Sequence, residues 1–141
     1  MRQYEASTLI AAPPERIWGV LADAGSYPSW DSGVERVTGA VAPGAKLTVV
    51  SSASPGRSFP VKVTELDAPR RMTWAGGMPL GLFRGVRTFT LTPEDDGTRF
   101  VMREQYSGPL LGLIWRSMPD LRPSFDTFAS GLKARVEAVG R

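Results

Sequence analysis

The stretch from residue 33 to residue 107 most constrains the fold, because extended segments separated by turn signals follow one another there without a helical pattern. Strands joined by short turns pair as antiparallel neighbours, since parallel pairing needs a long crossover connection. The Asp96-Gly97 dipeptide is a strong hairpin signal between the last two segments. The expected strands are residues 34–41, residues 46–52, a segment around Val61, a segment around Trp74, residues 83–92 and residues 98–107.

The residues before this stretch predict one more strand and two short helices. Residues 2–11 alternate, with Tyr4 and Ile10 on the same side, as in a strand. Pro13 and Pro14 then open a helix, in whose first turn the missing N–H of proline costs no hydrogen bond. Residues 27–31 are expected to form a second short helix or turn.

The C-terminal third is predicted to be helical. Apolar residues recur at steps of three and four from Ile114 to Val136, which is typical of one buried helix face. Pro119 and Pro123 interrupt this pattern, and a proline inside a helix bends or breaks it. We therefore expect a helical segment near residues 109–117, a break or kink at residues 118–120, and the main helix to about residue 139.

Together these segments predict an α+β fold, in which a curved seven-stranded antiparallel sheet wraps around a long C-terminal helix and two short helices lie between the first and second strands. Such a sheet is too wide for one helix to fill its concave side. We therefore expect an apolar cavity between sheet and helix that suits small apolar molecules. At 141 residues, the chain is expected to form a single ligand-binding domain, residues 1–141.

Two residue types are missing, and their absence excludes whole classes of chemistry. The chain contains no histidine and no cysteine. Disulfides, zinc fingers, iron–sulfur clusters and triads with a histidine base or cysteine nucleophile are therefore excluded. The Asp and Glu residues form no cluster with the spacing of metal ligands, so we expect neither a metal nor an organic cofactor.

The charge pattern gives little indication of a macromolecular partner. The net charge is +3, but the arginines are scattered and Arg70-Arg71 is their only adjacent pair, so nucleic-acid binding is not expected. No stretch approaches the roughly 20 apolar residues that span a bilayer, and the N-terminus has no continuous apolar region. The sequence favours a cytoplasmic protein, and it leaves both a monomer and a homodimer open.

Four short motifs, in order along the chain, carry a resemblance to a known family. They are Ile-x-Ala-Pro-x-Glu-x-Ile-Trp at residues 10–18, Tyr-Pro-x-Trp at residues 27–30, Gly-Thr-Arg-Phe at residues 97–100 and Glu-x-Tyr-Ser-Gly at residues 104–108. The chain resembles the START/Bet v 1-like (SRPBCC) superfamily, and within it the polyketide cyclase/dehydrase and lipid-transport group. The resemblance implies the helix-grip fold and a cavity for a hydrophobic ligand. It does not fix an activity, because the superfamily mixes carriers, sensors and cyclases.

The alternation of the last two strands identifies candidate polar site residues. Arg87 shares a strand face with Phe83 and Phe89, and on the partner strand Glu104 and Tyr106 share a face with Met102. If these aromatic-rich faces point inward, Arg87 and Glu104 point toward the cavity. A buried Arg and Glu are costly unless they pair. The two residues therefore form a structural ion pair, lie in solvent because the faces are reversed, or anchor the polar end of a ligand.

Further candidates come from the other strands and from the last helical region. Trp74 is a candidate to line the cavity, and Trp115 and Met118 precede the proline break, where the helix can open like a lid. The alternative for these residues is ordinary packing between helix and sheet. The candidate ligand-binding residues are Trp74, Phe83, Arg87, Phe89, Met102, Glu104, Tyr106, Trp115, Met118 and Phe125.

Three functions remain open at this point. The sequence favours a non-catalytic carrier or sensor of a lipid, isoprenoid, polyketide or other aromatic molecule. The alternative is a polyketide cyclase, aromatase or dehydratase, in which Arg87, Glu104 and Tyr106 converge and have shifted pKa values. An interaction module with an exposed apolar patch is the third.

Overall fold

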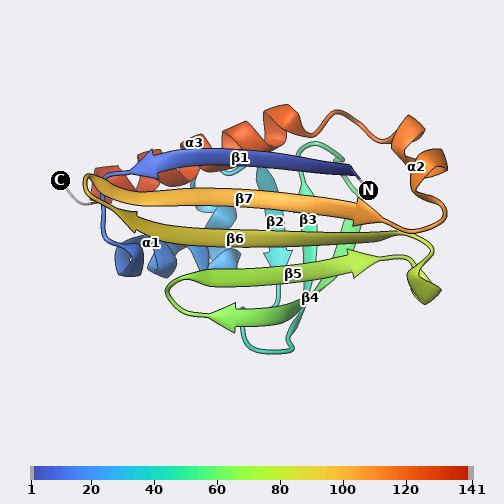
Figure 1. Cartoon of the computed structure of the whole chain (residues 1–141), viewed down its shortest axis with the longest axis horizontal. Coiled ribbons are helices and arrows are strands. Elements are labelled where there is room, and N and C mark those ends of the chain that lie inside the picture. Colours follow the sequence, from blue (N-terminus) through green and yellow to red (C-terminus); the bar gives the residue numbers. More distant parts are fainter. Residues whose placement is uncertain (1, 140–141) are drawn as a thin grey trace.

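One antiparallel sheet of seven strands, in the order β1-β7-β6-β5-β4-β3-β2, organises the computed structural model, which describes residues 2–139 (Figure 1). The predicted strands are confirmed, but β2 ends at Thr38 instead of residue 41. The reason is Gly39, whose φ of 103° turns the chain out of the extended conformation. The strands are β1 (Arg2–Ile10), β2 (Val34–Thr38), β3 (Lys46–Ser51), β4 (Ser58–Asp67), β5 (Arg71–Gly77), β6 (Arg84–Glu94) and β7 (Gly97–Ser107).

Two short helices lie between β1 and β2 as predicted, but the second covers residues 24–29 instead of residues 27–31. They are α1 (Pro14–Leu21) and the 3₁₀ helix η1 (Ala24–Ser29). Pro14 occupies the first helical position of α1, and Ile17 and Leu21 are its buried residues. A second 3₁₀ helix, η2 (Pro79–Gly81), connects β5 to β6.

The C-terminal region consists of two helices, α2 (Leu111–Ser117) and α3 (Arg122–Val139). The predicted break is confirmed, because Met118 has an extended backbone and Asp120 accepts the backbone N–H of Arg122 at 3.0 Å. That hydrogen bond satisfies one of the donors that the start of a helix leaves unpaired. Pro123 lies in the first turn of α3, where its missing N–H costs no hydrogen bond.

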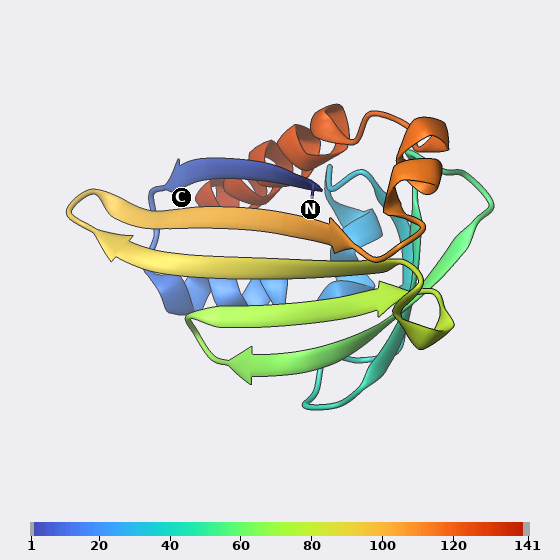
Figure 2. The ribbon, with the colours of Figure 1, turned by 45° about the vertical axis from the view of Figure 1, so that its right-hand side comes forward.

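The sheet curls around the helices. The strands β2 and β3 cross behind the long strands β5, β6 and β7, and α3 lies beside β1 (Figures 1 and 2). Phe128 of α3 links the layers, because its ring contacts those of Tyr27, Phe89 and Phe100. The core also includes Ile10, Ile17, Leu21, Leu47, Val63, Met72, Leu132 and Val136, each buried completely.

The two ends of this helical region are held differently. At the C-terminal end, Lys133 Nζ donates to Leu9 O at 2.7 Å, and Glu137 accepts the backbone N–H of Ala11 at 3.0 Å, so α3 is fixed to the end of β1. At the other end, α2 contains no fully buried residue and lies at the end of the sheet where β7 ends (Figure 2), and Leu110, just before α2, donates its backbone N–H to Leu82 O at 2.9 Å. The described helices therefore differ strongly in how firmly they are attached.

Candidate functional site

The strands β6 and β7 place their predicted residues on the concave face of the sheet. Arg87 pairs with Glu104 and Phe89 with Met102, in a register that continues without a shift along the whole hairpin. Phe89, Met102 and Tyr106 are at most 3% exposed. The predicted inward direction of this face is therefore correct, and no bulge reverses it.

Arg87, Glu104 and Tyr106 form one hydrogen-bonded cluster. Arg87 Nη2 donates to Glu104 Oε2 at 3.3 Å, and the Tyr106 hydroxyl donates to the same oxygen. The Arg87 and Glu104 side chains are 24% and 17% exposed, so the ion pair is neither solvated nor completely enclosed. The guanidinium carbon of Arg87 also lies 5.0 Å from the centroid of the Phe125 ring, within cation–π range.

Two tyrosines on the concave side have unusual proton affinities. Burial raises the pKa of Tyr106, and the charge of Glu104 and its hydrogen bond raise that pKa further. Burial also raises the pKa of Tyr27, whose hydroxyl donates to Leu21 O at 2.5 Å. Both tyrosines therefore stay protonated at neutral pH and act as hydrogen-bond donors.

Aromatic rings cover the cluster at the α2 end of the sheet. Phe83 stacks on Tyr106 with ring centroids 6.0 Å apart, and Trp115 of α2 stacks on Tyr4 at 5.3 Å. Trp115 also contacts Tyr106 at 5.6 Å. The structure thus brings Phe83 and Trp115 to the cluster, together with Tyr4, which sequence analysis did not select. The signal for Tyr4 was its position on the inward side of β1, directly opposite Glu104.

Trp74 lies on the neighbouring strand, deeper in the interior. It is 3% exposed, is paired with Arg87 across β5 and β6, and its ring lies 5.1 Å from that of Phe89. Its other ring neighbour is Tyr27, at 6.3 Å. Sequence analysis did not select Tyr27, although the Tyr-Pro-x-Trp motif contained it. Met118, the remaining candidate, is half-buried and follows α2.

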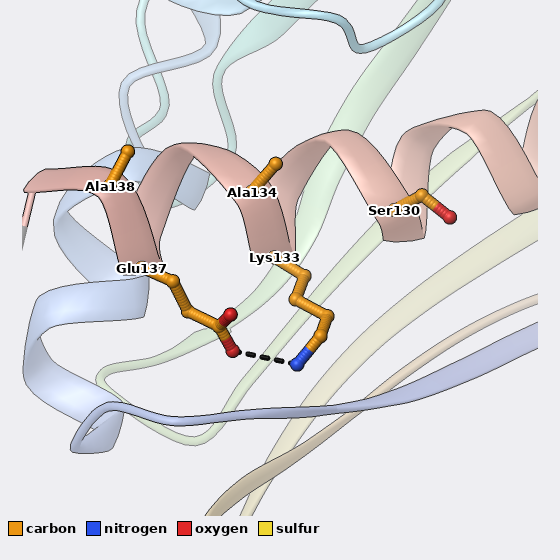
Figure 3. Close-up of a pocket in the computed structure, with 5 residues that line it drawn as sticks. All are labelled: Ser130, Lys133, Ala134, Glu137 and Ala138. Carbon is orange, nitrogen blue, oxygen red and sulfur yellow. Dashed lines mark hydrogen bonds and ion pairs between the residues drawn. The ribbon is translucent and has the colours of Figure 1, made fainter.

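The two best-defined hollows of the described residues lie outside this region. One, of about 400 Å³, runs along α3 and is lined by Lys133, Glu137 and three small residues (Figure 3). Its Lys133 and Glu137 are bonded to each other at 2.6 Å and to the main chain of residues 9 and 11, so they serve to attach α3. The other hollow, of about 370 Å³, adjoins the acidic β6–β7 turn. The enclosed cavity between sheet and helix stays a prediction, because neither of these two hollows is lined by the residues of the concave face.

Within residues 2–139, no three or more carboxylates are grouped so that they could hold a metal ion. Among the helices in the described part of the chain, none is both long and apolar enough to cross a membrane.

The curved sheet, the gripping helix and the aromatic concave face define a protein with the helix-grip, Bet v 1-like fold. The sequence model of the family described as polyketide cyclase/dehydrase and lipid transport matches residues 1–137. The chain therefore belongs to this family.

Solved structures share the fold at low sequence identity. A protein from Thermus thermophilus is 24% identical, with a TM-score of 0.74 over 99% of this chain and 100% of its own. The Zhui aromatase/cyclase of a Streptomyces species is 15% identical, with a TM-score of 0.76 over 99% and 96%. A norcoclaurine synthase point mutant from Thalictrum flavum is 17% identical, with a TM-score of 0.74 over 99% and 96%. A search of curated protein sequences gives no significant match.

Proposed function

We propose that this protein binds a hydrophobic small molecule, such as a lipid, isoprenoid, polyketide or other aromatic compound, between the sheet and the C-terminal helices, as a carrier or sensor. The observation that carries the proposal is the concave face itself, where aromatic rings surround a single polar cluster of Arg87, Glu104 and Tyr106. Apolar walls with few polar groups are typical of small-molecule sites.

Access to this face is expected through movement of α2. This helix contains no fully buried residue, and the non-helical residues 118–121 join it to α3. Its main attachment is Trp115, which rests on Tyr4 and Tyr106. Opening α2 exposes the aromatic cover and the polar cluster together, while Lys133 and Glu137 keep α3 on the sheet.

A second candidate function is supported by the convergence of three groups on one oxygen. Arg87 and Tyr106 both donate to Glu104 Oε2. In a cyclase or dehydratase, the Glu104 carboxylate would remove a proton, and Arg87 and Tyr106 would stabilise negative charge on an enolate oxygen. In the free protein these groups bond to one another, which favours an anchoring role and makes binding the first proposal.

Native mass spectrometry of freshly purified protein, followed by solvent extraction, tests the binding proposal. We expect an apolar adduct at about one molecule per chain, which disappears on unfolding. Purified protein should also bind long-chain fatty acids, isoprenoids or polycyclic aromatics in a tryptophan-fluorescence titration. A protein that carries no adduct and binds none of these classes contradicts the proposal.

The Glu104→Gln variant separates the two functions. A carrier should retain its affinity within roughly tenfold, about 1.4 kcal/mol. An enzyme should lose about 100-fold or more in rate, because an acid–base group contributes at least that much. Arg103→Gln, on the opposite face of the same strand, is the matched control and should change neither quantity.

A further inference from the structure

Three buried side-chain polar atoms in the described part of the chain have no hydrogen-bond partner, and all three are N–H donors. They are Trp30 Nε1, Trp74 Nε1 and Arg87 Nε. A buried donor without an acceptor costs about 1–3 kcal/mol, so folded proteins keep few of them. No buried side-chain oxygen of the described residues is among these unpaired atoms, so the missing partner should be an acceptor.

The three donors belong to one aromatic region. The ring of Tyr27 lies 5.4 Å from that of Trp30 and 6.3 Å from that of Trp74. Arg87 is the direct cross-strand partner of Trp74. Side chains at such positions on one face of a sheet have Cβ atoms about 5 Å apart, so the two donors belong to neighbouring side chains of the concave face. Of the two tryptophans, Trp74 gives the clearer case for a missing acceptor, because this residue is only 3% exposed.

The charge of this region selects the type of acceptor. Arg87 already pairs with Glu104, whose carboxylate lies on the same concave face, so the cluster has no net charge. A ligand carboxylate would be repelled by Glu104 and would lose its hydration among aromatic rings. A neutral carbonyl oxygen accepts two hydrogen bonds without these costs.

This inference rests on the proposed function. We propose that the ligand carries a neutral carbonyl oxygen, which accepts hydrogen bonds from Trp74 Nε1–H and Arg87 Nε–H, while its apolar body packs on the aromatic rings around Tyr27. The ligand class is therefore an aromatic or otherwise apolar ketone, ester or quinone-like carbonyl compound. Hydrocarbons of the same shape and apolar carboxylates bind more weakly.

Three probes of nearly equal shape test this assignment by titration calorimetry: fluorenone, fluorene and fluorene carboxylate. We expect fluorenone to bind about tenfold more tightly than fluorene, since two hydrogen bonds to otherwise unpaired donors are gained. Fluorene carboxylate should bind no more tightly than fluorene. If fluorene binds and fluorenone is no tighter, the carbonyl assignment is wrong and the proposed function stands. If none of the three binds, the carbonyl assignment is wrong, and the adduct analysis and the titrations with other apolar classes decide on the proposed function separately.

Two variants test whether the carbonyl oxygen of the ligand binds at these two residues. Trp74→Phe keeps an aromatic ring but removes the N–H, and Arg87→Lys keeps the charge but removes Nε–H. Each should reduce the preference for fluorenone over fluorene to about threefold or less, whatever its effect on the affinity for fluorene itself. A preference that survives both substitutions contradicts the assignment.

A nuclear magnetic resonance measurement on the unmodified protein does not depend on how well the variants fold. The indole N–H signal of Trp74 should shift further downfield with fluorenone than with fluorene at equal occupancy, because only fluorenone supplies a hydrogen-bond acceptor. Equal responses to the two probes overturn the assignment.

Discussion

Arg87 and Glu104 lie directly opposite each other on β6 and β7, and Arg87 Nη2 is 3.3 Å from Glu104 Oε2. The preceding residue of β7, Arg103, points to the convex face and pairs with Glu5 of β1 at the same distance of 3.3 Å. The two ion pairs differ in burial, because the side chains are 24% and 17% exposed in the first and 46% and 37% exposed in the second. Although the two ion pairs have the same N···O distance, their loss should therefore change the free energy of unfolding by different amounts.

Replacing Arg87 by Gln is expected to lower the free energy of unfolding by about 1–3 kcal/mol, because the half-enclosed Glu104 carboxylate loses its charged partner. Arg103→Gln should cost less than about 1 kcal/mol, since exposed pairs contribute little. Urea denaturation of both variants at neutral pH measures the difference. Equal losses would show that the concave pair has no more influence on stability than a surface pair.

Gly131 and Gly19 are both helical glycines, and their replacement by alanine should have opposite effects. A Cβ atom at Gly131 of α3 would lie 1.8 Å from the backbone oxygen of Asp31, whereas a Cβ atom at Gly19 of α1 meets nothing within 4 Å. Gly19→Ala should stabilise the protein by roughly 0.5–1 kcal/mol through helix propensity. Gly131→Ala should destabilise it by about 1–3 kcal/mol, because α3 must move away from the Asp31 loop.

Thermal and urea unfolding of the two alanine variants test this prediction. A stabilising Gly131→Ala substitution would mean that α3 does not approach residue 31 so closely in solution.

The buried tyrosines should make stability fall at high pH. The pKa values of Tyr27 and Tyr106 are raised by burial, so both stay protonated in the folded protein while they ionise in the unfolded chain above about pH 10. Their contribution to stability is complete below that pH and is lost as the pH rises further. Each tyrosine should lower the free energy of unfolding by about 1.4 kcal/mol per pH unit in this range.

Urea unfolding between about pH 9 and pH 11.5 measures this slope. Tyr27→Phe and Tyr106→Phe should each make the slope shallower by about the contribution of one tyrosine, whatever their effect on stability at neutral pH. A slope that neither variant changes would contradict protonated, buried tyrosines on the concave face.

Much of the fold follows from local patterns in the sequence. Strand side chains alternate with a period of two, so the sequence predicted that Arg87 shares a face with Phe89 and Glu104 with Met102, and left open whether these faces point inward. Pro119 and Pro123 predicted the break between α2 and α3, because proline cannot continue a helix. Both signals act within a few residues, and the structure confirms both.

The tertiary structure alone decided which distant residues meet. The pairing of β1 with β7 brings Tyr4 opposite Glu104, and the packing of α2 places Trp115 on Tyr4. It also decided that Trp74 and Arg87 become cross-strand neighbours, and that Trp74 Nε1 and Arg87 Nε are buried without an acceptor. The residue pattern determines which side chains share a face of a strand. How closely the interior is packed, and which donors are left without an acceptor, depend on the curvature of the sheet and on side-chain volumes. Residues far apart in the sequence determine both together.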